Sequence, residues 1–195
     1  MNVVSRAQGI ILNPKEEWKK IKDETIPLSQ LFTSYVLILA AIPAVARFLG
    51  GALIGLGRPY AGLGIGTALV QAIVYYIGSL VTVYIIGLII NALASTFSSV
   101  QNRENAMKLA VFSMTPAWIA GILYIIPFLG VLVIFASFYG IYLMYLGLTT
   151  PLMETPKEKV AGYLVVIILV SLVVMVVVGM IFGAISTVGG VGGVI

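Results

Sequence analysis

The chain has 195 residues, of which 61% are hydrophobic and only 9% are charged. Soluble domains carry roughly 25% charged residues, so this composition excludes an ordinary water-soluble domain and indicates an integral membrane protein. The absence of Cys and His excludes thiol nucleophiles, Cys/His metal sites and a Ser/His/Asp triad. The net charge of +4 is accounted for by the loops described below, and we expect no nucleic-acid partner.

Residues 1–27 form a polar segment ahead of the first long apolar run. Apolar side chains recur at helical spacing over residues 3–11, which predicts a short amphipathic helix. Asn13 is placed to cap a second short helix, with Pro14 at its first position. Opposite charges four residues apart within residues 16–24 support this second helix.

We interpret both short helices as lying on the cytoplasmic surface of the membrane, with Trp18 as an interfacial anchor. The alternative is that they pack beneath the helix bundle. Under the first interpretation, the residues that recognise the membrane interface or a partner are Asn13, Pro14, Trp18, Lys19 and Lys20.

Five apolar segments follow, each close to the roughly 20 residues that a helix needs to span hydrocarbon. Spans are predicted near 28–49, 66–91, 109–126, 129–149 and 160–185, which form a transmembrane domain over 28–187, before a Gly/Val tail at 188–195. The run from Leu109 to Thr149 contains no charge, and as one helix it would be about 60 Å long. It must therefore fold back, and the turn is expected at 127–130, where Pro and Gly break the pattern.

The basic residues sort to one side of this arrangement. Nine of the eleven Lys and Arg residues fall in the N-terminal segment, the loop between spans two and three, and the loop between spans four and five. Only Arg47 and Arg58 fall on the other side. Basic loops face the cytoplasm, so the sequence predicts an all-α polytopic bundle with a cytoplasmic N-terminus and an external C-terminus.

Glycines are concentrated in residues 50–66, but no Lys-Ser or Lys-Thr follows them, so we expect no nucleotide there. Gly179 and Gly183 have the GxxxG spacing inside the last span, which predicts close packing against another helix. No ionisable residue lies deep in a span, which argues against a proton- or sodium-coupled transporter. We expect no catalytic site, cofactor or metal.

Aromatic residues recur every third position along the fourth span, at Tyr139, Tyr142 and Tyr145. This face serves either in packing between helices or in a groove that contacts a ligand or lipid. Gln71 and Tyr142 are the candidates for lining such a cavity.

Three segments resemble motifs of the Yip (Ypt/Rab-interacting protein) domain family in its prokaryotic form. They are Asn13–Ile21 before the first span, Ala110–Pro116 in the third span and Tyr139–Leu148 in the fourth. The residues that match as structural motif positions are Pro116, Tyr139, Gly140, Tyr142 and Gly147. The resemblance implies five spans and a cytoplasmic N-terminus, and its eukaryotic members act in vesicle trafficking and membrane shaping.

The first functional hypothesis is accordingly a non-enzymatic membrane organiser or adaptor that works through its cytoplasmic surface. Its expected partners are membrane lipids and other membrane proteins or further copies of itself, in the plasma or inner membrane if the source is prokaryotic. The alternative is a passive channel or carrier for a lipid or a small apolar solute.

Overall fold

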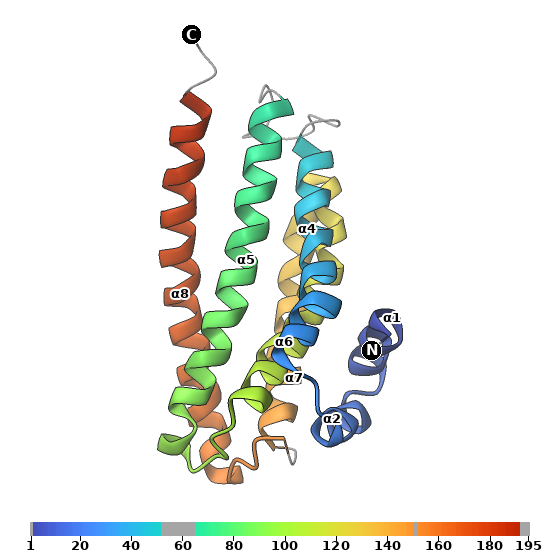
Figure 1. Cartoon of the computed structure of the whole chain (residues 1–195), viewed down its shortest axis with the longest axis vertical. Helices are drawn as coiled ribbons and strands as arrows, with labels where there is room; N and C mark the ends of the chain where they lie inside the picture. Colours follow the sequence, from blue (N-terminus) through green and yellow to red (C-terminus); the bar gives the residue numbers. More distant parts are fainter. Residues whose placement is uncertain (1, 52–64, 150–151, 192–195) are drawn as a thin grey trace.

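The computed structural model describes residues 2–51, 65–149 and 152–191, and all regular structure in these ranges is helical (Figure 1). In chain order the elements are α1 (Val3–Leu12), α2 (Pro14–Asp23), α3 (Leu28–Leu31), a π-helical segment (Phe32–Val36), α4 (Leu37–Leu49), α5 (Ile65–Leu93), a 3-10 turn (Ser95–Phe97), α6 (Arg103–Ala120), two 3-10 segments (Gly121–Ile125 and Pro127–Leu132), α7 (Val133–Thr149) and α8 (Lys157–Val191). The predicted all-α class is confirmed.

Within the described residues, five helices are long and apolar enough to cross a membrane, as the sequence predicted. They cover Leu28–Leu49, Ile65–Leu93, Arg103–Ile125, Phe128–Thr149 and Lys157–Ala184. The first of these joins α3, the π-helical segment and α4 into one rod. The chain is therefore a multi-pass membrane protein.

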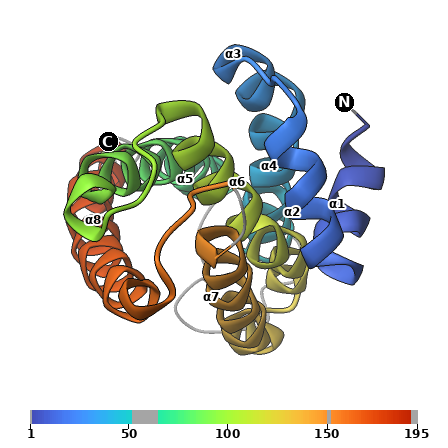
Figure 2. The same cartoon turned by 90° about the horizontal axis from the view of Figure 1, so that it is seen from below.

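The hydropathy of the spans predicts how deeply they are buried. The third span, which contains α6, is the least hydropathic of the five and the most buried, whereas the fifth, in α8, is the most hydropathic and the least buried. α6 packs against α4, α5 and α7, and α8 packs mainly on α5 (Figures 1 and 2). Because lipid tails are apolar, polar side chains are kept inside the bundle and apolar ones face outward.

The long apolar run does fold back between α6 and α7. Ile126 leaves the helix with φ −107° and ψ 103°, and the Leu129 N–H then donates to the Ile126 carbonyl at 2.8 Å. α6 begins at Arg103, earlier than the apolar run itself, because the Asn102 side chain accepts hydrogen bonds from the N–H groups of Glu104 and Asn105. The apolar residues show which part of a helix lies in the membrane, but they do not show where the helix itself begins.

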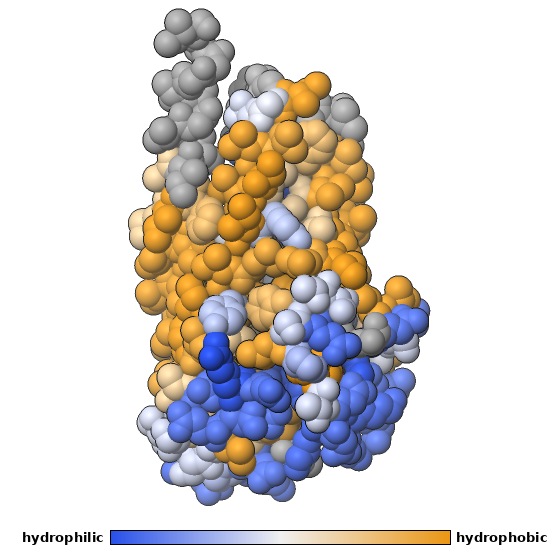
Figure 3. Space-filling model, in the orientation of Figure 1, coloured by the Kyte–Doolittle hydropathy of each residue, from blue (hydrophilic) through white to orange (hydrophobic). Residues whose placement is uncertain are grey.

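Hydrophilic side chains gather at one end of the molecule, around α1, α2 and the loops beside them (Figure 3). Contacts between distant segments hold this end together. Lys22 pairs with Glu154 at 3.2 Å, and the Lys159 Nζ donates to the Ser98 hydroxyl at 2.7 Å. The three basic segments that the sequence assigned to one side of the membrane therefore meet at one end of the bundle.

Three sequence predictions concern glycine-containing segments, two of which extend beyond the described residues. The glycine-rich loop lies mostly within residues 52–64, which are outside the described residues, as is Arg58. α8 continues to Val191, so residues 188–191 of the expected tail are helical. The expectation for Gly179 and Gly183 is wrong within the described chain, because a Cβ added at either position would meet no atom within 4 Å.

Candidate functional site

The α2 helix lies against α6 and α7, and Trp18 is the side chain that fills this contact. Trp18 is fully buried and meets the Phe112 ring edge-on, with 6.2 Å between ring centroids. A Cβ added at Gly147 would collide first with the Leu109 side chain and would lie 3.2 Å from the Trp18 indole, so the glycine makes room for both side chains. The expected interfacial anchor is therefore corrected: Trp18 packs beneath the bundle, as the alternative interpretation had it.

The last carbonyls of a helix lack partners within the helix, and α6 and α7 supply them for both short helices. The Tyr139 hydroxyl donates to the Ile11 carbonyl near the end of α1 at 2.6 Å. The Lys108 ammonium donates to the carbonyls of Ile21 and Glu24 at the end of α2, at 3.1 and 2.6 Å. Lys108 is itself 3% exposed. We call this surface of α6 and α7 (Lys108, Phe112, Tyr139, Gly147) the N-terminal seat.

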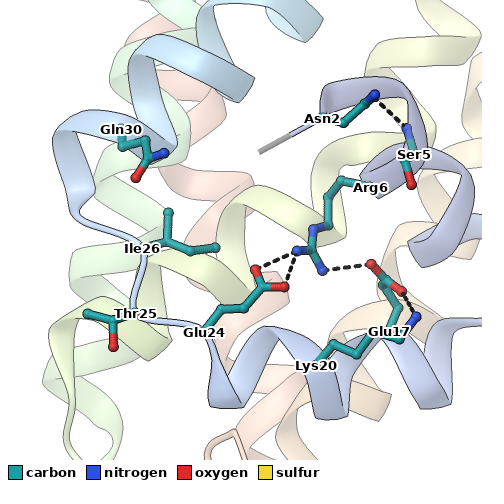
Figure 4. Close-up of a pocket in the computed structure, with 9 residues that line it drawn as sticks. All are labelled: Asn2, Ser5, Arg6, Glu17, Lys20, Glu24, Thr25, Ile26 and Gln30. Carbon is teal, nitrogen blue, oxygen red and sulfur yellow. Dashed lines mark hydrogen bonds and ion pairs between the residues drawn. The ribbon is translucent and has the colours of Figure 1, made fainter.

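A buried ion cluster joins α1 to α2 (Figure 4). The Arg6 guanidinium donates to the Glu17 carboxylate at 2.6 Å and to both oxygens of Glu24 at 2.5 Å. Arg6 and Glu17 are 8% and 7% exposed, and the Arg6 guanidinium also lies 5.9 Å from the centre of the Phe112 ring. Buried charges are tolerated only when they are paired, so this cluster fixes the angle between the two helices.

A cavity of about 530 Å³ opens beside this cluster. Its walls are polar and come from α1, α2 and the segment that leads into the first span (Figure 4): Asn2, Ser5, Arg6, Glu17, Lys20, Glu24, Thr25, Ile26 and Gln30. Among the described residues, no group of three or more His, Cys, Asp or Glu could hold a metal ion. The cavity offers a ligand charged groups and hydrogen-bonding groups from both short helices.

The outer face of α2 carries exposed charges. Lys19 pairs with Glu16 at 2.9 Å and Lys20 with Glu17 at 3.1 Å, so the ion pairs form three residues apart and not four. The hydrogen bond from the Lys19 ammonium holds the pKa of the Glu16 carboxyl below its ordinary value. The Lys side chains at 19 and 20 are 60% and 66% exposed, which leaves both accessible to a partner.

The start of α2 agrees with the sequence in its position and differs in its cap. The helix begins at Pro14 as expected, but the Asn13 side chain makes no cap hydrogen bond. The Asn13 backbone N–H instead donates to the Gly9 carbonyl at 2.9 Å, so this residue closes α1 and opens α2. The turn between the helices is held by backbone bonds.

The third-span and fourth-span motifs form the support beneath the seat. A Cβ added at Gly140 would lie 2.6 Å from the Ser113 carbonyl oxygen, so this glycine lets α7 approach the backbone of α6. Pro116 is buried in α6, and the neighbouring Thr115 hydroxyl lies 2.8 Å from the buried Tyr35 hydroxyl on the first span. The three motif segments thus converge on one packed unit.

The aromatic face of α7 divides in two. Tyr139 belongs to the N-terminal seat and bonds to α1, while Tyr142 and Tyr145 are 41% and 43% exposed and face outward, where lipid surrounds the bundle. Tyr142 is in the lining of neither of the two cavities described below that Gln71 lines, so the expected pairing of these two residues is not found there. Gln71 does line two cavities nearer the opposite end of the bundle.

Sequence reasoning missed the buried charges at positions 6, 17 and 108. Arg6 carried a detectable signal, because it falls beside Ala7 and four residues before Ile10, on the buried face of α1. Lys108 carried another, since it is the last charge before the longest apolar run. A cation at such a place requires acceptors from another segment.

Comparisons with known proteins agree with the motif evidence. The family model of the Yip1 domain matches residues 9–194. Similar curated proteins include the inner membrane protein YohC of Escherichia coli (strain K12) and of Escherichia coli O6:H1, each 27% identical over 161 residues that cover 80% of this chain and 83% of the relative. No solved structure matches the chain. Because the family model spans nearly the whole chain, including all three motif segments that meet at the N-terminal seat, this protein belongs to the Yip1 domain family.

Proposed function

We propose that this protein is a non-enzymatic membrane organiser or adaptor, and that α1 and α2 form its recognition platform. The observation that carries the proposal is the seating of these helices, because Lys108 and Tyr139 complete the backbone hydrogen bonding at the ends of both. A platform fixed in this way presents its exposed lysines without a further ordering cost on binding. The similarity to an inner membrane protein of Escherichia coli supports placement in a plasma or inner membrane.

The platform is proposed to face the cytoplasm. Support comes from the positive-inside rule and from the clustering of basic segments at the end that holds α1 and α2. With five spans, the C-terminus then lies on the external side.

A reporter fused after Ile195 is expected to be external, and one fused before Met1 cytoplasmic, because an odd number of spans separates them. An alkaline phosphatase fusion, active only outside, and a green fluorescent protein fusion, fluorescent only inside, give opposite readouts for the two ends. Activity of the same reporter at both ends would contradict this orientation.

Replacing Lys19 and Lys20 together with serine is expected to weaken capture of anionic vesicles by protein held in a neutral-lipid nanodisc. Each lysine near an anionic surface contributes about 1 kcal/mol, so affinity should fall roughly tenfold or more. Flotation of vesicles with bound nanodiscs measures this change. Trp18 is left intact because it is buried and its loss would disturb the fold.

The matched control replaces Lys157 and Lys159 with serine, which removes the same charge from the first turn of α8 at the same end of the bundle. The proposal is supported if vesicle capture falls in the Lys19 and Lys20 variant and stays unchanged in the control. Equal drops would show that net charge alone governs capture, and the proposal would be wrong.

A second candidate function is a passive carrier for a lipid or small apolar solute. The observation that favours it is a cavity of about 490 Å³ within the membrane-spanning region, lined in part by Gln71, Ser79 and Thr82. Reconstituted vesicles that hold a fluorescent lipid distinguish the two functions. A carrier would bring the lipid of the inner leaflet to the outer leaflet, where added dithionite destroys its fluorescence. A static organiser would leave the inner-leaflet lipid protected.

A further inference from the structure

Arg47 stands apart from every other charge that the structure describes. It lies two residues before the end of the first span, at the opposite end of the bundle from α1 and α2. The seven acidic residues of the chain all fall within 16–24 or at 104, 154 and 158, in the segments that form the hydrophilic end (Figure 3). No Asp or Glu side chain forms an ion pair with Arg47 among the described residues.

Two tyrosine rings hold the Arg47 guanidinium in place. Its central carbon lies 4.3 Å from the centre of the Tyr75 ring and 3.9 Å from that of Tyr124. Cation–π contacts of this kind orient a cation and leave its N–H groups directed sideways. The Nε of Arg47 is buried and has no hydrogen-bond partner among the described residues.

Close backbone packing fixes the Tyr124 side of this arrangement. A Cβ added at Gly50 would lie 2.5 Å from the Tyr124 carbonyl oxygen, and one added at Gly130 would lie 2.8 Å from the Tyr124 ring. A side chain at either position would collide with Tyr124, so both positions require glycine. The ring is thus positioned by the fold before any ligand binds.

Arg47 lines one cavity, and a second, larger cavity adjoins it. The first, which we call the Arg47 chamber, has a volume of about 230 Å³ and is lined by Arg47, Gly51, Ala68, Gln71, Ala72, Tyr75, Tyr124 and Gly130. The second, the lateral groove, has a volume of about 490 Å³ and runs between α5, α6, α7 and α8. Gln71, Tyr75 and Tyr124 line both, so the chamber and the groove share a wall.

The lateral groove is apolar in effect, although hydroxyls line it. The Ser79 hydroxyl donates to the Tyr76 carbonyl at 2.8 Å, and the Ser137 hydroxyl donates to the Val133 carbonyl at 3.1 Å. Both are satisfied by their own helices. Gly179 borders the groove and an added Cβ there would meet nothing within 4 Å, so this glycine widens the space.

We propose that the Arg47 chamber and the lateral groove together bind one anionic phospholipid, with the phosphate at Arg47 and an acyl chain along the groove. The unneutralised cation, the apolar trough beside it and the surrounding bilayer together select a ligand with a charged head and a long apolar chain. The site goes beyond the proposed organiser role, because it lies at the end of the bundle opposite the α1–α2 platform.

Native mass spectrometry of the purified protein, titrated with phosphatidylglycerol in a neutral detergent, tests the site. The wild-type protein is expected to retain one phosphatidylglycerol. Arg47→Gln should weaken retention about tenfold or more, since it removes a charge-assisted interaction. Gly179→Phe should weaken it to a similar degree by filling the groove while leaving Arg47 in place.

Arg103→Gln is the matched control, because it removes the same charge at the opposite end, where Arg103 contacts Tyr84. Its retention of phosphatidylglycerol should equal that of the wild type. The proposal is overturned if the wild type retains no lipid, if neither Arg47→Gln nor Gly179→Phe lowers retention, or if phosphatidylcholine is held equally well. Equal retention of oleate, or of glycerophosphoglycerol without chains, would also overturn it.

Discussion

Replacing Arg6 with alanine is expected to release α1 and α2 from the N-terminal seat. The change leaves Glu17 buried without its cation, and removing one partner of a buried ion pair costs about 3–5 kcal/mol. Glu17 is 7% exposed and Lys20 approaches it only from the solvent side, at 3.1 Å, so it cannot replace Arg6. The platform should therefore undock while the spans remain folded.

Trp18 fluorescence measures this undocking directly, in a Trp118→Phe background that leaves a single indole. Trp18 is fully buried, so its emission should shift to longer wavelength in the Arg6→Ala variant. Lys19→Ala is the control, because its ion pair with Glu16 is exposed on both sides and is worth at most about 1 kcal/mol. An unshifted emission in Arg6→Ala would refute the role of the cluster.

The second large effect is expected at Gly140. An alanine Cβ there would stand 2.6 Å from the Ser113 carbonyl oxygen, and a backbone atom within a helix cannot move aside as a side chain can. Overpacking of this kind costs about 1–3 kcal/mol. Because α6 and α7 carry the whole seat, Gly140→Ala should lower the midpoint of thermal unfolding in detergent and loosen α1 and α2 as well.

Gly179→Ala is the matched control for Gly140→Ala. Gly179 also lies inside a helix, but an added Cβ meets no atom within 4 Å. The only expected effect is the gain in helix propensity from glycine to alanine, about 0.5–1 kcal/mol. If both variants shifted the unfolding midpoint equally, the close approach of α7 to α6 could not be the reason for Gly140.

The membrane-spanning architecture was predictable because it depends on local composition. A run such as 109–149 can satisfy the bilayer only by folding back, and the Pro and Gly at 127–130 mark where it does. Helix starts were less predictable. The cap at Asn102 adds polar turns to α6 that hydropathy cannot detect.

The position of Trp18 was not predictable from its own segment. An amphipathic stripe shows that one face of α2 avoids water, but lipid headgroups and a protein surface satisfy that need equally well. The residues that decide the matter, Phe112 and Gly147, lie 94 and 129 positions after Trp18 in the chain. The partners of Lys108 were also not predictable, because they are backbone carbonyls, which have no sequence signature, 87 and 84 positions away.

The N-terminal seat lies far after α1 and α2 in the sequence, so the two helices are synthesised long before the surface on which they dock. The bond from Tyr139 to Ile11 closes a loop of 128 positions, and the bond from Lys108 to Ile21 closes one of 87. α1 and α2 leave the ribosome first, yet they acquire their final partners only after the fourth span has been inserted. During translation Trp18 and the last carbonyls of α1 and α2 must therefore remain in contact with water, headgroups or a chaperone, and docking of the two short helices is a late event in maturation.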